Sequence, residues 1–239
     1  MIVLGIETAT DVCGVAVVCD GKVAGEESIA GRHIHSERLL SLIETVLRHV
    51  PSYDVVAVST GPGSFTGLRI GLSVAKGLAF GSDRPLVAVP TLEALVYRTV
   101  MQKCSPSFGF VLALIDARRN DAYAALYGVD GDERRNIWGP RAVSLEQIFE
   151  LLPTDGAITI VGDGAEKFRK FLEFNGRSIG ASFPDQEDWI CSAAAVALLG
   201  EKLARCGNYS ALASVEPLYV KEFETLVATQ HISSTDREK

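Results

Sequence analysis

The sequence predicts an α/β protein made of two similar halves, each with a mixed sheet. In each half, three strand-like segments lead into alternating helices and strands, so the same element order occurs twice. In each half, an Asp-Gly pair, at Asp20-Gly21 and Asp130-Gly131, marks a hairpin turn between the second and third strands. The residues themselves barely repeat. A duplicated fold of this kind predicts a cleft between the halves in which a ligand could bind.

The first half is predicted to contain five strands and three helices. Short apolar runs predict the strands, and apolar residues at helical spacing predict the helices. The predicted strands are Met1–Thr8, Gly14–Cys19, Val23–Ile29, Tyr53–Ser59 and Leu86–Val89. The predicted helices are His35–Val50, Leu68–Phe80 and Thr91–Met101.

The second half repeats this order with fewer elements. Its predicted strands are Phe108–Ile115, Ala122–Tyr127, Asn136–Val143 and Ile158–Val161. Its predicted helices are Leu145–Leu152, with a capping box formed by Ser144 and Gln147, then Ala165–Phe174, and Cys191–Cys206, which has Ser192 near its start.

Composition divides the chain into three parts. The polar segment Lys103–Ser107 contains a proline and predicts a linker. Residues beyond Phe223 lose apolar periodicity and predict a mobile tail. We therefore expect an N-terminal domain at 1–103, a C-terminal domain at 104–222 and a tail at 223–239.

Charge and composition exclude several classes of protein. The chain is 47% apolar and 22% charged, which is typical of a folded globular protein. Its net charge of −7 argues against binding of nucleic acid by this chain alone, because phosphate binding needs clustered Lys and Arg. No apolar run approaches the ~20 residues of a membrane span, and no signal region is evident. Five scattered cysteines without a CxxC pair indicate reduced thiols, so we expect a cytoplasmic protein without a membrane partner.

A glycine-rich loop separates the fourth strand from the second helix. A strand–loop–helix connection places N–H groups at a helix N-terminus, where they can bind an anion. The Walker pattern requires Lys and a hydroxyl residue after the last glycine, but Leu68 and Arg69 follow Gly67, and the GxGxxG pattern also fails. The loop is either an anion site or a tight turn whose glycines serve packing. Its candidate residues are Gly61, Gly63, Ser64, Thr66, Gly67 and Arg69.

Two helices of the first half carry more apolar surface than one core contact needs. At ~100° per residue, apolar side chains cover ~200° of helix 68–80 and ~160° of helix 35–50. Packing on one core needs only a stripe of ~100°. The helices are either deeply buried or in contact with a partner subunit, while Arg69, Ser73 and Lys76 form a narrow polar stripe. The partner interpretation names as interface Leu39, Leu42, Ile43, Val46, Leu68, Leu72, Ala75, Lys76 and Ala79.

Few side chains are placed for catalysis. The candidate carboxylates are Glu7, Asp11, Asp116 and Asp163, near the ends of predicted strands. Carboxylates in such places hold Mg²⁺ in phosphotransferases, but they also cap turns, so both interpretations stay open. The four histidines show no metal-binding spacing and no GxSxG stretch occurs, so we predict neither a metal site nor a catalytic residue.

Several motifs together resemble one family. GIETAT, HSERLL, GPGSFTGLRIGLSVAKGLA, DARRNDAY, VGDGA and PLYVKE occur in this order. They resemble the bacterial tRNA threonylcarbamoyladenosine biosynthesis protein TsaB, a YeaZ-type, glycoprotease-like family. The resemblance covers residues 1 to about 221 and is most specific in the glycine-loop stretch. It implies an actin-like (ASKHA, RNase H-like) fold, which sugar kinases, acetate kinase and chaperone ATPase domains share.

The resemblance implies a scaffold subunit without catalysis of its own. TsaB looks like a degenerate paralogue of the catalytic subunit TsaD, which transfers a threonylcarbamoyl group to the adenosine beside the anticodon of tRNAs reading A-starting codons. It implies a TsaD-type partner bound through helices 35–50 and 67–81, a TsaE-type ATPase, and a homodimer through the same surface when TsaD is absent. The resemblance implies that the chain contacts tRNA only as part of the complex. It implies no cofactor in the isolated chain, and whether a nucleotide binds at the heterodimer interface stays an open question.

One departure from the catalytic paralogue bears on activity. The places of its two metal-binding histidines match Thr91 and Leu95, which cannot build that metal site. The rival hypothesis is an ATPase or phosphotransferase of the same fold, with Asp11, Asp116 or Asp163 holding Mg²⁺. A metallopeptidase, the third hypothesis, lacks a ligand set.

Overall fold

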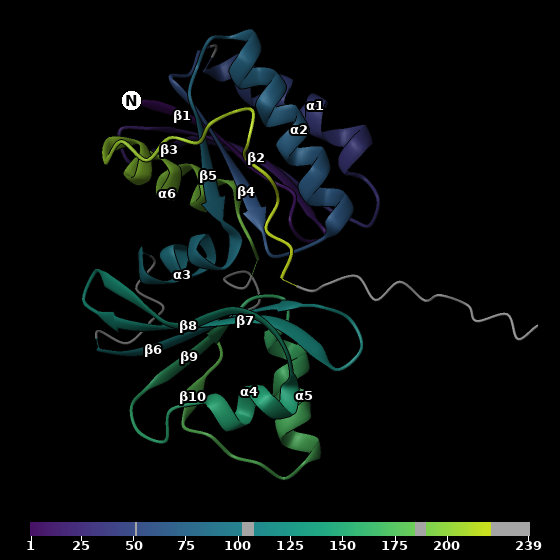
Figure 1. The fold of residues 1–239 in the computed structure, drawn as a ribbon, viewed down its shortest axis with the longest axis vertical. Coiled ribbons are helices and arrows are strands. Elements are labelled where there is room, and N and C mark those ends of the chain that lie inside the picture. Colours follow the sequence, from purple (N-terminus) through teal and green to yellow (C-terminus); the bar gives the residue numbers. More distant parts are fainter. Residues whose placement is uncertain (51, 102–107, 185–189, 221–239) are drawn as a thin grey trace, which may run out of the picture.

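The computed structural model describes residues 1–50, 52–101, 108–184 and 190–220, which form two sheets with helices between and outside them (Figure 1). The element order is the predicted one, with the two-residue strand β10 added. The linker predicted within 103–107 and the tail predicted at 223–239 lie outside the described residues.

The first sheet has five strands in the order β3-β2-β1-β4-β5. β1, β2 and β3 form an antiparallel meander, and β4 and β5 continue the sheet in parallel with β1. The strands are β1 (Ile2–Glu7), β2 (Val12–Cys19), β3 (Lys22–Ala30), β4 (Val55–Gly61) and β5 (Leu86–Pro90). Helices α1 (His35–His49) and α2 (Phe65–Gly81) cover one face. Because helices cover both faces, the central strands are apolar along nearly their whole length.

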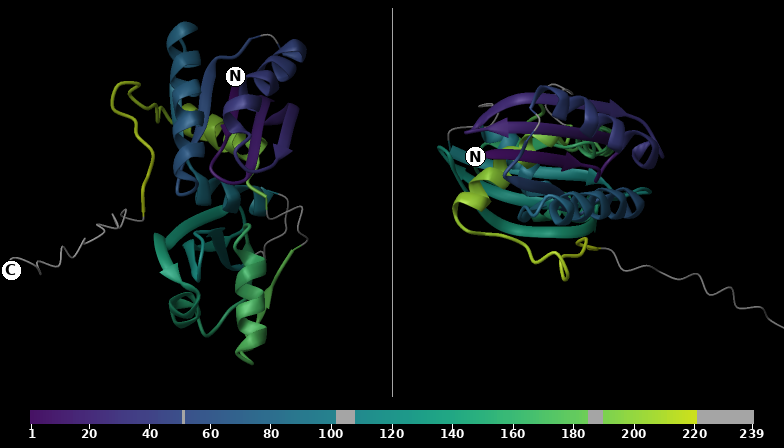
Figure 2. Two further views of the ribbon diagram at one scale, coloured as in Figure 1. Left: turned by 90° about the vertical axis from the view of Figure 1, so that its right-hand side faces the viewer. Right: turned by 90° about the horizontal axis from the view of Figure 1, so that it is seen from above.

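The second sheet repeats this topology in the order β10-β9-β6-β7-β8. Its strands are β6 (Phe108–Asp116), β7 (Asp121–Asp130), β8 (Glu133–Ser144), β9 (Ile158–Val161) and β10 (Ala181–Ser182). Helices α4 (Leu145–Leu151) and α5 (Ala165–Phe174) pack on one face. The capping box of Ser144 and Gln147 is confirmed. The side view shows the two halves one above the other, with α1 and α2 in one half and α5 in the other (Figure 2).

Two helices lie between the sheets. Helix α3 (Thr91–Met101) belongs to the first half of the chain but packs against β6, β7 and β9 of the second sheet. Helix α6 (Ala193–Arg205) belongs to the second half but covers β1, β2 and β4 of the first sheet. The two helices also contact each other. The division at residue 103 stays a prediction, and these contacts show that α6 completes the core of the first sheet.

Small residues let α6 approach the first sheet closely. A Cβ on Gly5 of β1 would lie 2.5 Å from the carbonyl oxygen of Ala193 and 2.7 Å from the Cβ of Ala197. A Cβ on Gly200 would lie 2.4 Å from the Cβ of Ala57 in β4. Side chains cannot share such space, so glycine is required at both contacts.

Polar contacts hold α6 at both ends. Ser192 caps the helix by accepting from the Ala195 amide at 3.2 Å, and Glu26 of β3 accepts from the Ala194 amide at 3.0 Å. Near the other end, the buried Glu201 carboxylate accepts from the Gly21 amide at 2.8 Å and pairs with Arg205 at 2.6 Å. The β2–β3 hairpin thereby fixes where α6 lies on the sheet.

Helix ends differ from the prediction where a side chain supplies the cap. Helix α2 begins at Phe65 rather than at Leu68, because the Ser64 hydroxyl accepts from the Gly67 amide at 3.3 Å. Helix α6 spans 193–205 rather than 191–206, since Ser192 is its N-cap.

We expect Gly5→Ala to lower the free energy of unfolding by about 1–3 kcal/mol, because the added methyl group overpacks the contact with α6. The control is Gly77→Ala in α2, where a Cβ would meet nothing within 4 Å. This substitution should stabilise the protein by about 0.4–1 kcal/mol. Urea unfolding followed by circular dichroism measures both. Equal effects of the two substitutions would contradict the proposed close contact.

Candidate functional site

The glycines of the loop between β4 and α2 are explained by packing inside the chain. A Cβ on Gly63 would lie 2.2 Å from the carbonyl oxygen of Ala9, and a Cβ on Gly67 would lie 2.1 Å from that of Thr8. Thr8 and Ala9 belong to the turn between β1 and β2, which presses against the loop. The glycines therefore provide room for the chain's own backbone.

Several loop amides that could hold an anion donate to atoms of the same chain. The Gly61 amide donates to the Thr91 hydroxyl at 3.0 Å, and the Ser64 amide donates to the Ala9 carbonyl at 2.6 Å. The amides of Gly67 and Leu68 donate to the side chain and carbonyl of Ser64. The geometry favours the tight-turn interpretation, with Thr66 and Arg69 left exposed at the start of α2.

Glu7 is a fully buried carboxyl group at the end of β1. Its Oε1 accepts from the Ala9 amide at 2.5 Å, while its Oε2 has no hydrogen-bond partner among the described residues. Burial, and to a smaller extent the nearby charge of Asp163, raise the pKa of Glu7 to about 7, although the hydrogen bonds from Ala9 and Ser59 act in the opposite direction. Near neutral pH this group is therefore partly protonated.

Of the other three candidate carboxylates, Asp11 and Asp163 lie in loops and Asp116 is the last residue of β6. The Asp163 carboxylate accepts a hydrogen bond from the Asp116 amide at 2.9 Å. Desolvation and the charges of Asp116 and Asp11 raise the pKa of Asp163 to about 6, although its side chain is still in contact with solvent. Asp116 is paired with the Lys167 ammonium at 2.6 Å, and Asp11 is paired with Arg32 at 3.4 Å. The Lys167 ammonium therefore lies beside Asp116 at a position where a bound metal cation would otherwise be.

The described residues contain no group of three or more His, Cys, Asp or Glu side chains arranged to hold a metal ion. The two positions that match the metal-binding histidines of the catalytic paralogue have structural roles. Thr91 is buried and accepts from the Gly61 amide, and Leu95 is buried in the core against the second sheet.

The predicted interface residues lie mostly inside the chain. Those with buried side chains are Leu39, Leu42, Ile43, Val46, Leu68, Leu72, Ala75 and Ala79, and only Lys76 is half-buried. The apolar stripe chosen from the sequence is the one that packs on the first sheet. These side chains are therefore covered by this chain itself, and their assignment to a partner interface stays a prediction.

The same two helices nevertheless expose apolar side chains on another flank. Leu40 of α1 is 59% exposed, and half-buried apolar side chains of both helices accompany it. We call this set the apolar seam: Leu40, Leu47, Ile70, Val74 and Leu78. Ile70, Val74 and Leu78 follow each other at intervals of four residues and so form one line along α2.

A segment after α6 crosses the opposite flank of α2. This C-terminal strap, residues 207–220, pairs Ser210 with Leu86 of the edge strand β5 and donates from the Leu218 amide to the Thr60 carbonyl at 2.7 Å (Figure 1). Arg69 donates to the Tyr219 hydroxyl at 2.9 Å. Apart from the PLYVKE motif, no sequence signal indicates the strap, since it has neither helical nor strand periodicity.

Comparison with known proteins assigns the chain to a family. The family model described as TsaD, tRNA N6-adenosine threonylcarbamoyltransferase, matches residues 28–225. The TsaB protein of Haemophilus influenzae is 32% identical over 184 residues, which cover 72% of this chain and 76% of that protein. The TsaB protein of Escherichia coli is 29% identical over 231 residues, covering 92% of this chain and 95% of that protein. The chain belongs to the TsaB family.

Its relation to the transferases themselves is partial. The tRNA N6-adenosine threonylcarbamoyltransferase of Symbiobacterium thermophilum is 32% identical over 148 residues, which cover 53% of this TsaB-family chain but only 43% of the transferase. The chain therefore resembles less than half of that relative.

Solved structures confirm the actin-like fold. YeaZ from Pseudomonas aeruginosa superposes with a TM-score of 0.77 at 24% identity, covering 91% of this chain and 99% of that one. Lmo2764 from Listeria monocytogenes, a proposed N-acetylmannosamine kinase, superposes with a TM-score of 0.51 at 10% identity, covering 84% of this chain and 100% of that one. In the described part of this chain, no helix is long and apolar enough to span a membrane.

We expect Glu7→Gln to flatten the pH dependence of stability. Between about pH 4.5 and 7 the unfolded chain loses the Glu7 proton while the folded chain retains it, so the free energy of unfolding falls as pH rises through this window. The substitution removes this loss, so the variant should gain up to roughly 3 kcal/mol relative to the wild type between these limits. Urea unfolding at a series of pH values measures the effect.

The control for this experiment is Glu133→Gln, which changes an exposed carboxyl group at the start of β8. Its pH profile should run parallel to that of the wild type. A parallel profile for Glu7→Gln as well would show that Glu7 is ionised in the folded protein, contrary to the expectation.

Proposed function

We propose that this TsaB-family chain is a non-catalytic subunit of the complex that forms threonylcarbamoyladenosine in tRNA, and that it docks on a TsaD-type catalytic subunit through the apolar seam. Its relatives are named for threonylcarbamoyladenosine biosynthesis, and the matching family model is that of the transferase. A TsaE-type ATPase is the further partner in this proposal. The net charge of −7 favours an arrangement in which other subunits contact the tRNA.

The observation that carries the proposal is the apolar seam. Large apolar side chains exposed side by side cost free energy in water and mark contact sites. Gly77 lies on the exposed side of α2, where nothing comes within 4 Å of its Cβ position, so a helix of a partner can approach closely. A homodimer through the same surface is the expected state when the partner is absent.

Three features favour docking over catalysis. The glycine-loop amides named above donate within the chain, and Thr8 and Ala9 occupy the space in front of the loop. The Asp116 carboxylate is paired with Lys167 instead of being free for Mg²⁺. These contacts argue against the ATPase or phosphotransferase hypothesis, and no observation favours it specifically.

We expect Val74→Glu to weaken binding of the TsaD-type subunit from the same organism at least 100-fold. A carboxylate in the centre of an apolar interface loses its hydration without gaining a partner, which costs roughly 3 kcal/mol or more. Isothermal titration calorimetry measures the affinity, and tRNA modification by the reconstituted complex should fall in parallel. Leu40→Glu on α1 should act in the same direction.

The matched control is Ser41→Glu, which adds the same charge to an exposed position of α1 outside the apolar seam. It should leave the affinity within about threefold of the wild type, and circular dichroism should show that all three variants are folded at the temperature of the binding measurement. Wild-type affinity for both Val74→Glu and Leu40→Glu would refute docking through the apolar seam.

A further inference from the structure

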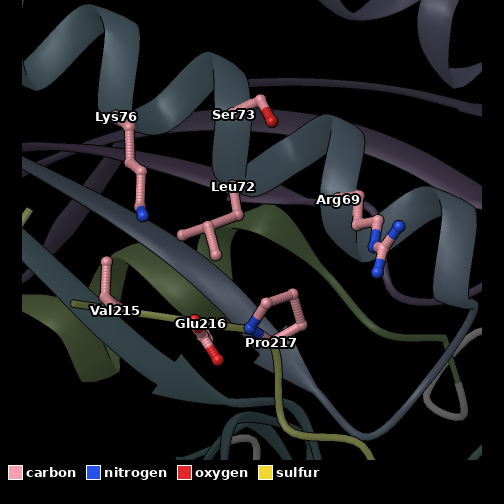
Figure 3. Close-up of a pocket in the computed structure, with 7 residues that line it drawn as sticks. All are labelled: Arg69, Leu72, Ser73, Lys76, Val215, Glu216 and Pro217. Carbon is pink, nitrogen blue, oxygen red and sulfur yellow. The ribbon is translucent and has the colours of Figure 1, made fainter. Parts of the chain in front are cut away.

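A small pocket opens between α2 and the C-terminal strap. It has a volume of about 190 Å³ and is lined by Arg69, Leu72, Ser73, Lys76, Val215, Glu216 and Pro217. The side chains of Arg69 and Lys76 extend from α2 toward the strap (Figure 3). Leu72, Val215 and Pro217 provide apolar walls.

The two cations at this pocket lack a counterion within the described chain. Among described residues, no carboxylate oxygen lies within 4.0 Å of the Lys76 ammonium or the Arg69 guanidinium. Glu216 is exposed on the pocket rim without forming an ion pair there. In a chain with net charge −7, two unpaired cations beside apolar walls make a local site for an anion.

The strap holds one of these cations in place. Arg69 lies over the Phe65 ring at 3.9 Å and donates its Nε–H to the Tyr219 hydroxyl at 2.9 Å. These contacts use the ring face and one N–H of the guanidinium, so its terminal N–H groups stay able to donate to a ligand. Because Val215 and Pro217 also come from the strap, the pocket exists only while the strap lies on α2.

The size of the pocket decides between classes of anion. Sites for small molecules and cofactors usually enclose about 300–1,000 Å³. A pocket of about 190 Å³ is too small for a nucleotide and large enough for one carboxylate side chain. The pocket also shares α2 with the apolar seam, so a protein docked on that helix can reach it.

We infer that the pocket receives an Asp or Glu side chain of the protein that docks on the apolar seam, with Lys76 and Arg69 as its ion-pair partners. This inference rests on the proposed function and adds a polar anchor to its apolar contact. Two cations on a carboxylate beside apolar walls form charge-assisted hydrogen bonds, which are stronger than neutral ones. The anchor fixes the position of the partner along α2, which the apolar seam alone does not specify.

The test measures affinity for the TsaD-type subunit with the full-length chain. Lys76→Met keeps the aliphatic side chain and removes the charge, so it should weaken binding about tenfold or more and reduce the dependence of affinity on salt. Tyr219→Phe removes the hydroxyl that holds Arg69 and should weaken binding in the same direction by a smaller factor. Arg84→Met, which removes an exposed cation after α2, is the matched control and should change neither quantity.

The outcomes separate this inference from the proposed function. If Lys76→Met binds as the wild type does while Val74→Glu does not bind, the apolar seam is the interface and the carboxylate anchor is refuted. If the wild-type chain does not bind the subunit at all, both are refuted. Binding of ADP to the isolated chain that Lys76→Met abolishes, with the affinity for the subunit unchanged, would identify a small-molecule site and also overturn the anchor.

Discussion

The close approach of α6 to the first sheet is the contact on which the rest of the structure depends. Gly5 and Gly200 allow the helix to lie against β1 and β4 with almost no side chain between them. This contact closes the second face of the first sheet with an element from the end of the chain. It also determines where the chain emerges after Arg205, so that the strap reaches the edge strand β5 and the flank of α2.

Glycine is used at the loop before α2 for the same purpose as under α6. In both places a Cβ would collide with backbone of the same chain, at Ala9 and Thr8 in the loop and at Ala193 under the helix. A glycine-rich loop at a helix N-terminus is thus compatible with an anion site but does not require one. An anion can bind such a loop only where its amides and the space in front of them are free. In this chain the β1–β2 turn occupies that space.

Periodicity predicts the elements well and the contacts between them poorly. The bounds of α3, β9 and α5 match the predicted ones because apolar spacing and flanking turn residues define them locally. The positions of α3 and α6 between the sheets depend on contacts far apart in sequence. The wide apolar arc of α2 does not show which part of the arc meets the chain's own sheet, so the sequence alone does not distinguish burial of Leu72 and Ala75 from contact with a partner. The strap has no periodic signal at all.

The two flanks of α2 suit two different tasks in recognition. On one flank, Ile70, Val74 and Leu78 offer apolar area, which supplies affinity but tolerates sliding along the helix, because apolar contact is not directional. On the other flank, Lys76 and Arg69 offer charge at fixed points, which contributes register and selectivity more than affinity. The strap orients Arg69 through Tyr219 and forms one wall of the pocket. Since α6 determines where the strap lies, packing in the core between the sheets sets the geometry of a surface at the edge of the molecule.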